Sequence, residues 1–251
     1  MNSVKTSPLR SPSERTKPAK KKRFKFRPFH NLAYDFVFIT GALPALLWLR
    51  PKIHYPFGKP KKTGALLVSS NHHTMIDPII IQTAFPFRRL NSIATKDLFN
   101  TPIKAFFFRQ VHCIEIDKDN FSLASFHDVV ERLDERRLVL IFPEGGVHTK
   151  SGNEIQAFKS GVVLMAHKSH APIIPLYVVR REKWYHRQHI VMGQAIDVRE
   201  QLGLIPTVDK IAAVSDMLRD KELELRAYYE SFVRKIPIKY KQQRKDDATH
   251  E

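Results

Sequence analysis

A histidine and an aspartate five positions apart are the residues of this chain whose types and spacing best fit a chemical reaction. His72 follows an apolar run at residues 65–68 and the polar residues 69–71, and Asp77 comes five positions after it. A neutral imidazole can accept a proton near pH 7, and a carboxylate beside it can fix its tautomer and stabilise the imidazolium that forms. The pair therefore indicates a general-base site. A helix cap or a tight turn uses the same residue types, so the spacing alone leaves both interpretations open.

A second polar cluster follows a second apolar run, about seventy residues further on. Residues 138–142 are apolar, and Pro143, Glu144, Gly145 and Gly146 come directly after them. Glycine after a strand lets the backbone take a positive φ and approach a ligand closely. Alone, the segment also fits a strand followed by a tight turn with an exposed glutamate. Sites in α/β folds collect at the carboxyl ends of the strands, so we expect both clusters to face one cleft.

Taken in order, these segments resemble the glycerolipid acyltransferases, the family that includes 1-acylglycerol-3-phosphate acyltransferase. The resemblance runs from about Gly64 to Val179. It rests on several ordered partial matches, which are Asn71-His72 with Asp77, residues 96–99 with Pro102, residues 114–118, residues 142–145, residues 158–161 and residues 171–175. The chain departs from the family pattern after Phe-Pro-Glu-Gly, where Gly146 and Val147 replace a threonine and an arginine.

The resemblance implies an enzyme that moves a fatty acyl chain from acyl-CoA or acyl carrier protein to the hydroxyl of 1-acylglycerol-3-phosphate. The product would be phosphatidic acid, made in phospholipid synthesis. It implies His72 as general base and Asp77 as its orienting group, with no covalent enzyme intermediate, no metal and no cofactor beyond the acyl donor. Substrate binding is expected of a further set of residues, namely Asn71, Lys96, Lys118, Glu144, Gly145, Gly146 and Lys159. With Val147 in place of arginine, glycerol-3-phosphate or another lysophospholipid stays open as the acceptor.

A metal site and a nucleophilic cysteine are two other chemistries that the residue types of this chain would allow. His72, His73 and Asp77 could be ligands in a metal hydrolase, but adjacent histidines on a turn rarely both face one ion. Cys113, the single cysteine of the chain, lies on an expected strand beside His112. Neighbouring strand residues point to opposite faces, so His112 is poorly placed to activate the thiol. We expect a buried, inert cysteine.

The positive charge of the chain is concentrated near its N-terminus, and this distribution limits the classes of partner that we expect. The formal net charge is +17 over 251 residues, and residues 1–30 hold ten Lys or Arg against the single acid Glu14. Cations alternating with phenylalanines at residues 20–29 suit an anionic membrane surface, although charge alone would also suit nucleic acid. The aromatic residues elsewhere form no nucleic-acid-binding motif. We therefore expect membrane lipids as partners and no nucleic acid, with a basic nucleic-acid-binding protein as the remote alternative.

An apolar segment at residues 36–49 follows the basic region. Its 14 residues fall short of the roughly 20 that a simple spanning helix needs, and basic residues flank both of its ends. Gly41 and Pro44 favour a kink. We expect a segment that lies in or dips into one leaflet at the cytoplasmic face of the membrane. A buried core helix is the alternative.

Strand-like and helix-like runs alternate along the rest of the chain, which predicts a single α/β domain. We expect a largely parallel mixed sheet flanked by helices, preceded by the membrane-associated helical segment. The expected strands are 66–70, 92–94, 113–116, 139–142, 173–179 and 190–192, and the expected helices are 101–109, 121–136, 157–169 and 208–233. The expected units are a basic tail (1–30), a membrane-associated segment (31–52), an acyltransferase domain (53–233) and a basic C-terminal tail (234–251).

Overall fold

The computed structural model describes residues 28–117, 123–146, 155–181, 183 and 185–234. Most of both expected basic tails, together with Lys118 and Val147, therefore lies outside the described residues. So does Asn120, the residue before the expected helix at 121–136.

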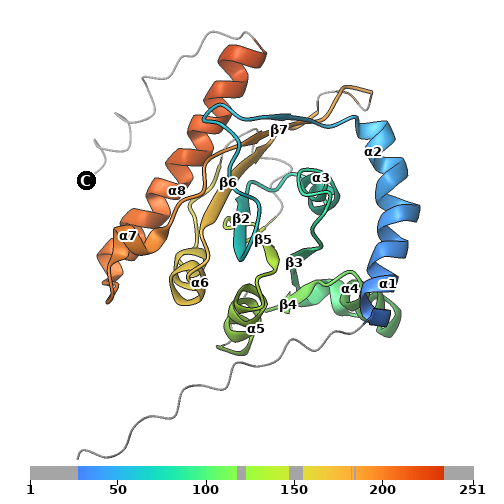
Figure 1. The fold of residues 1–251 in the computed structure, drawn as a ribbon, viewed down its shortest axis with the longest axis horizontal. Helices are drawn as coiled ribbons and strands as arrows, with labels where there is room; N and C mark the ends of the chain where they lie inside the picture. The colour runs from blue at the N-terminus through green and yellow to red at the C-terminus, as the bar shows by residue number, and fades with distance from the viewer. Residues whose placement is uncertain (1–27, 118–122, 147–154, 182, 184, 235–251) are drawn as a thin grey trace, which may run out of the picture.

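A seven-stranded sheet forms the centre of the molecule (Figure 1). Its strands are β1 (Lys52–His54), β2 (Leu66–Ser70), β3 (Leu90–Thr95), β4 (Ile114–Ile116), β5 (Leu138–Ile141), β6 (Ile173–Val178) and β7 (His189–Met192). They lie in the order β1-β7-β6-β2-β5-β3-β4, and every neighbouring pair is parallel except β6 with β7. The expected α/β fold with a largely parallel mixed sheet is confirmed.

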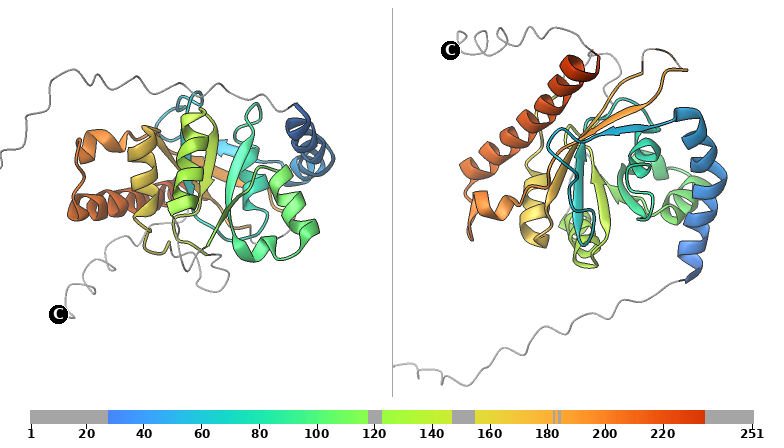
Figure 2. Two further views of the ribbon diagram at one scale, coloured as in Figure 1. Left: turned by 90° about the horizontal axis from the view of Figure 1, so that it is seen from below. Right: turned by 45° about the horizontal axis from the view of Figure 1, so that its top comes forward.

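Helices cover both faces of the sheet (Figures 1 and 2). The helical elements are α1 (Pro28–Val37), η1 (Phe38–Ala42), α2 (Leu43–Leu49), α3 (Asp77–Gln82), η2 (Lys96–Phe99), α4 (Pro102–Gln110), α5 (Leu123–Asp134), α6 (Gly161–Ser169), α7 (Val198–Leu202), α8 (Val208–Tyr228) and η3 (Tyr229–Val233). Helices α5, α6 and α8 lie on one face, while α2 and α3 lie on the other.

The core follows from the alternation of side chains along the buried strands. In β2, Leu67 points to the α6 and α8 face, whereas Leu66 and Val68 point to the α3 face. All five residues of β2 are buried, which is expected of a strand covered by helices on both sides. The central strands β2, β5 and β6 therefore form a rigid platform, and their carboxyl ends meet at one edge.

The first strand and the helix that opens at Asp77 were not expected from the sequence. The expected strands include none before residue 66, but β1 pairs with β7 through Lys52, Ile53 and His54. Three residues carry too little pattern to indicate a strand, and only their pairing partner makes them one. Helix α3 was missed for the same reason, because it has only six residues. The boundary of the expected membrane segment therefore falls near Leu49, and the helix itself begins at Pro28, within the expected basic tail.

The apolar segment belongs to a longer helical run than the sequence indicated. Helices α1, η1 and α2 follow one another without a break, and the π-helical turn η1 contains Gly41, where a kink was expected. Residues 32–49 form an 18-residue apolar window of mean hydropathy 1.7, of which 12% is buried. By length and composition, this helix could cross a membrane. The shortness of residues 36–49 therefore no longer argues against a crossing.

Candidate active site

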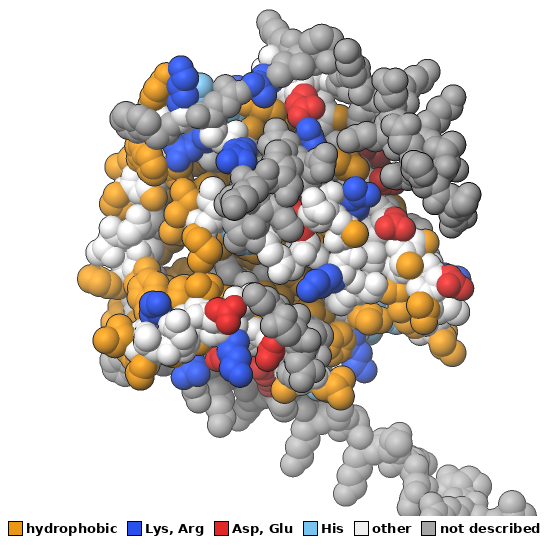
Figure 3. Space-filling view, turned by 180° about the vertical axis from the view of Figure 1, so that it is seen from behind, with side chains coloured by type: hydrophobic (Ala, Val, Ile, Leu, Met, Phe, Trp, Pro, Cys, Tyr) orange, Lys and Arg blue, Asp and Glu red, His pale blue; other side chains and the backbone are white. Residues whose placement is uncertain are grey.

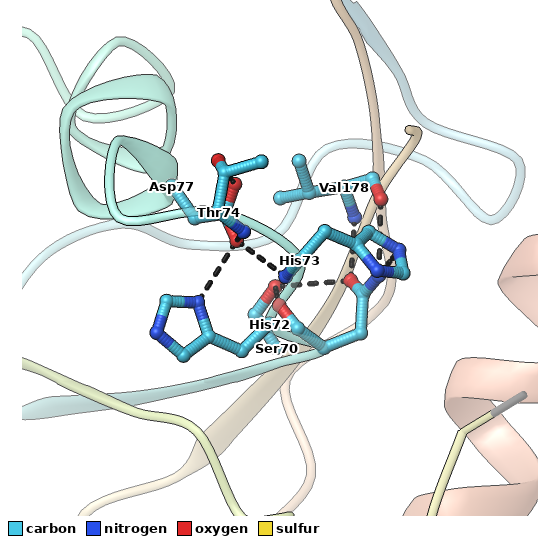
Figure 4. A network of polar contacts seen from close by, with 7 residues as sticks. Ser70, His72, His73, Thr74, Asp77 and Val178 are labelled. Carbon is cyan, nitrogen blue, oxygen red and sulfur yellow. Dashed lines mark hydrogen bonds and ion pairs between the residues drawn. The ribbon is translucent and has the colours of Figure 1, made fainter. Parts of the chain in front are cut away.

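The turn after β2 holds His72 and Asp77 against each other. The Nδ1 atom of His72 lies 2.9 Å from Oδ2 of Asp77 (Figure 4). The same carboxylate accepts the backbone N–H groups of His73 at 2.7 Å and Thr74 at 2.8 Å, and the Thr74 hydroxyl at 2.6 Å. Asp77 is the first residue of α3, and its carboxylate closes the turn that precedes the helix. The tight turn and the His–Asp pair are therefore made by one side chain, whereas the N-cap residue of α3, Ile76, makes no side-chain cap hydrogen bond.

Hydrogen bonding decides the charge of Asp77. Burial by itself would raise the pKa of this carboxyl, but the hydrogen bonds from His72 and Thr74 outweigh it and hold the pKa below its ordinary value. Asp77 is therefore a carboxylate at neutral pH, and it accepts the proton on Nδ1 of His72. In the neutral imidazole this leaves Nε2 as the basic nitrogen. The His72 side chain is 13% exposed, compared with 2% for Asp77.

The turn after β5 meets the His72 ring directly. Phe142 lies one residue beyond β5, and its ring stacks on the imidazole with centroids 3.8 Å apart and an interplanar angle of 11°. Strands β2 and β5 are parallel neighbours, so their carboxyl ends deliver both turns to the same edge. The expectation that the two polar clusters share one site is met. Sequence reasoning assigned no role to Phe142, although it lies in the recognised motif.

Behind Phe142, the chain turns tightly and receives a lysine from further along the sequence. Gly145 has φ +75°, and a Cβ atom built there would lie 2.8 Å from Nζ of Lys159. The backbone N–H of Lys159 donates to the Pro143 carbonyl at 3.0 Å, and the Glu144 carboxylate accepts the N–H of Gln156 at 3.1 Å. The Glu144 carboxylate thus ties the turn to residue 156, and Lys159 lies over the Gly145-Gly146 turn.

Asn71 and His73 lie on the buried side of the first turn. The Asn71 amide donates to the Val178 carbonyl at 3.0 Å and accepts the Val178 N–H at 2.8 Å, which extends the pairing of β2 with β6. Nδ2 of Asn71 also lies 2.7 Å from Nε2 of His73. We expected Asn71 to bind substrate, but it is 1% exposed and holds two strands together. The His73 ring points away from His72 (Figure 4), so the two imidazoles do not face one ion.

The remaining lysines of the expected site are less central. Lys96 is exposed at the start of η2, after β3, which is separated from β2 by β5. Lys118 lies outside the described residues. Among the described residues, no group of three His, Cys, Asp or Glu is placed to hold a metal ion. Cys113 lies one residue before β4 and is half-buried, not fully buried as expected. Burial still raises the pKa of Cys113 to about 12, so this thiol stays protonated and unreactive.

A buried carboxyl group that the sequence did not indicate is hydrogen-bonded to the strand that leads to His72. Glu222 of α8 is fully buried and accepts the Ser69 hydroxyl at 2.6 Å, three residues before His72. Burial raises the pKa of Glu222 well above its ordinary value, and the charge of Glu144 raises it further. The only sequence signal was a pair of serines inside an apolar strand.

Comparisons with known proteins agree with this geometry. A sequence model of the acyltransferase family matches residues 50–179, slightly more than half of the chain. A 1-acyl-sn-glycerol-3-phosphate acyltransferase of Bacillus subtilis is 23% identical over 198 residues, covering 75% of this chain and 96% of that protein. A protein of the same name from Limnanthes alba is 34% identical over 142 residues, covering 55% of this chain and 48% of the plant protein.

A solved structure shows the same fold. The crystal structure of the 1-acyl-sn-glycerophosphate (LPA) acyltransferase PlsC from Thermotoga maritima superposes with a TM-score of 0.53. The match covers 79% of this chain and 80% of that one, at 16% sequence identity. At that identity the likeness concerns the arrangement of helices and strands.

Proposed function

This chain belongs to the acyltransferase family, and from that premise we propose that it transfers a fatty acyl chain from a thioester to the hydroxyl of 1-acylglycerol-3-phosphate. The product would be phosphatidic acid for phospholipid synthesis. The observation that carries the proposal is the Asp77–His72 pair, which leaves a basic Nε2 beside the turn after β5. The relatives named for this acceptor support the choice of substrate.

The proposed reaction needs one proton carrier and no covalent enzyme intermediate. His72 Nε2 takes the proton of the acceptor hydroxyl as its oxygen attacks the thioester carbonyl, and the C–O bond forms while the C=O electrons move to oxygen. When the carbonyl re-forms, the C–S bond breaks and the thiolate leaves with the electron pair. The imidazolium then returns its proton to that thiolate, so the histidine ends the cycle neutral.

Asp77 contributes by holding the imidazole rather than by moving a proton. Its charge stabilises the imidazolium that forms during attack, and its contact with Nδ1 keeps Nε2 toward the substrate. Phe142 limits the rotation of the ring from the other side. The base is therefore fixed before the substrate arrives, which lowers the entropic cost of reaching the transition state.

The acceptor phosphate needs a cation close to His72, because the reacting hydroxyl and the phosphate lie on neighbouring carbons of glycerol. Lys159 lies over Gly145. Gly145 follows Phe142, whose ring stacks on His72, by three residues. We therefore assign the phosphate mainly to Lys159, with Lys96 further out on the same edge. Glycerol-3-phosphate and other lysophospholipids carry a phosphate in the same place and remain the alternative acceptors.

Membrane association forms part of the proposal, because the acceptor is a lipid. A stripe of large apolar side chains along α1, η1 and α2 is exposed, consisting of Leu32, Phe36, Ile39, Leu43 and Leu47. The opposite side of the helix docks on the domain, where Tyr34 bonds to Gln82 and Asp35 pairs with Arg89 at 2.7 Å. Such a two-sided helix is suited to lie against or within lipid while holding the domain at its surface.

A thiol-release assay with acyl-CoA and a panel of acceptors tests the proposal. We expect turnover with 1-acylglycerol-3-phosphate and much less with acceptors that lack phosphate. In Lys159→Met, KM for the phosphate acceptor should rise about tenfold, the loss expected for one charge-assisted hydrogen bond. Lys168→Met, an exposed lysine at the far end of α6, is the matched control. Equal turnover of phosphate-free acceptors would contradict the acceptor assignment.

A further inference from the structure

A basic pocket with a volume of about 470 Å³ lies beside the candidate active site. It is lined by Arg50, Val179, Arg180, Arg181, Tyr185, His186, Arg187, His189, Tyr229 and Arg234. These residues come from the residue after α2, the segment that joins β6 to β7, the start of β7, and η3 with the residue after it. In Figure 3, Lys and Arg side chains gather at the upper left, next to hydrophobic side chains.

The charge of this pocket is strongly positive. Five arginines and two histidines line it, and none of its described lining residues is acidic. The connecting segment 180–187 as a whole carries four Lys or Arg against one acid. The histidine at its edge reflects this field: burial first, then His54, Lys52 and Arg187, lower the pKa of His189 to about 4. A bound polyanion would relieve the repulsion among these cations.

Several contacts hold the arginines in place. Nε of Arg187 donates to the Arg50 carbonyl at 2.7 Å, and Nη2 of Arg50 donates to the Tyr185 carbonyl at 3.4 Å. The Arg181 guanidinium stacks over the Trp48 ring, 4.6 Å from its centroid. The segment after β6 is thereby fastened to the end of the apolar helix, and the pocket lies where that helix ends.

The pocket lies at the same edge of the sheet as His72, but at a different strand. Asn71, next to His72, bonds to Val178, and Val179 lines the pocket. Strand β6 is the neighbour of β2 on the side away from β5, whereas the His72 ring stacks on Phe142 beyond β5. The pocket therefore lies on the other side of the first turn from Lys159.

We propose that this arginine-lined pocket binds the phosphate groups of coenzyme A, so that the acyl donor is acyl-CoA. The inference rests on the proposed function and assigns the donor side of the same site. The pantetheine arm of acyl-CoA separates its thioester from its phosphates, so a cationic pocket apart from His72 is the arrangement this donor needs.

The number of charges and the shape of the pocket also favour the donor over the acceptor. The acceptor has one phosphate, which must lie beside its reacting hydroxyl. Coenzyme A has a pyrophosphate and a 3′-phosphate, and several arginines are suited to bind them through paired N–H donors. Tyr185 and Tyr229 line the pocket, and aromatic rings are the side chains on which an adenine base stacks. Acyl-CoA has an apolar acyl chain and a charged nucleotide. A charged pocket at the end of an apolar helix suits a molecule with these two parts.

The experiment compares donors in the full-length protein with exposed arginines replaced. In Arg180→Gln and in the double variant Arg180→Gln/Arg187→Gln, KM for acyl-CoA should rise about tenfold or more. KM for acyl-pantetheine, which lacks the nucleotide and every phosphate, should stay within about twofold, as should KM for the acceptor. Arg199→Gln on the exposed side of α7, at the far end of α8 from the pocket (Figure 1), is the matched control.

A binding measurement separates this proposal from the proposed function. Adenosine 3′,5′-bisphosphate should bind the wild-type chain in calorimetry, compete with acyl-CoA, and bind the double variant about tenfold or more weakly. If the protein transfers no acyl chain to any glycerolipid, the proposed function fails, and the calorimetry still decides the pocket. The pocket assignment is overturned if the bisphosphate does not bind, if KM for acyl-CoA is unchanged, or if the acceptor KM rises instead. Thermal melting of each variant identifies any that is not folded.

Discussion

The turn after β2 and the turn after β5 meet at one ring contact but are built in different ways. In the first, the Asp77 carboxylate collects the side chain of His72, two backbone N–H groups and a hydroxyl, all from within six residues. In the second, Gly145 takes φ +75° and the chain leaves room for Lys159, which arrives fourteen residues later. The proposed base is thus positioned by neighbouring residues, and the lysine beside it is supplied by a distant segment.

This difference in construction predicts how substitutions in each turn affect the reaction. A group that moves a proton must keep one geometry, and short-range hydrogen bonds fix it at small entropic cost. A group that binds a substrate can come from elsewhere, because its position depends on packing between segments. Variants in the first turn should therefore alter the chemical step, and variants in the second should alter substrate affinity.

The largest effect is expected for His72→Ala. Loss of the general base should lower kcat by about 10²–10⁴-fold with any acceptor. The melting temperature should change little, because the ring is partly exposed and its main packing partner is Phe142. Single-turnover rates measured beside melting curves check both statements. Activity within tenfold of wild type would remove His72 from the role of base.

Asp77→Asn should lower kcat by a smaller factor, about 10²-fold, because the orienting acid of such a unit contributes less than the base. It should also destabilise the fold, since Asp77 is buried and accepts four hydrogen bonds. The folded-state pKa of Asp77 is lowered from 3.8, so its charge stabilises the fold above that pH, and the advantage is lost as pH falls through the lowered value. Melting curves of both proteins should therefore converge in acid. A gap that stays constant down to pH 2 would show that the charge of Asp77 contributes nothing.

Gly145→Ala tests the second turn. A Cβ atom would lie 2.7 Å from Cε of Lys159, so the lysine must move and KM for the phosphate acceptor should rise several-fold. The positive φ adds about 1–2 kcal/mol of instability. Gly64→Ala is the control, because φ is +83° there and a Cβ would meet nothing within 4 Å. We expect similar melting temperatures for the two variants and a changed KM for Gly145→Ala alone. An equal KM change in both would point to strain rather than to Lys159.

The smallest effect is expected for Glu222→Gln, beneath both turns. Burial raises the pKa of Glu222 above its ordinary 4.5, so the folded protein retains a proton that the unfolded chain releases. Wild-type stability therefore falls as pH rises above 4.5, and a neutral glutamine avoids this loss. The variant should melt about 2–4 °C higher at pH 8, with no gain at pH 4. A lower melting temperature at pH 8 would show that the carboxyl is bound in its charged form.

The expected strands and helices were found where buried apolar runs were long. Strand β2 begins and ends at the predicted residues, because five consecutive buried residues leave little choice of register. Strand β1 was missed because its only support is β7, which is more than 130 residues away. Helix α3 was missed because its six residues are too few to show a helical pattern of apolar side chains. The length of the apolar helix was underestimated, since its first turns are formed by polar and aromatic residues.

For the candidate site, the sequence by itself determined the contact between His72 and Asp77, because both residues lie within one turn and their spacing brings them together. It also determined the family and the expectation that two strand ends meet. Only the tertiary structure placed Phe142 on the imidazole, buried Asn71 between two strands and brought Lys159 over Gly145. The arginine pocket likewise exists only after β6, β7, η3 and the end of α2 pack together. The physical reason is range: hydrogen bonds within a turn depend on local backbone geometry, whereas contacts between segments depend on how the whole sheet is ordered and covered.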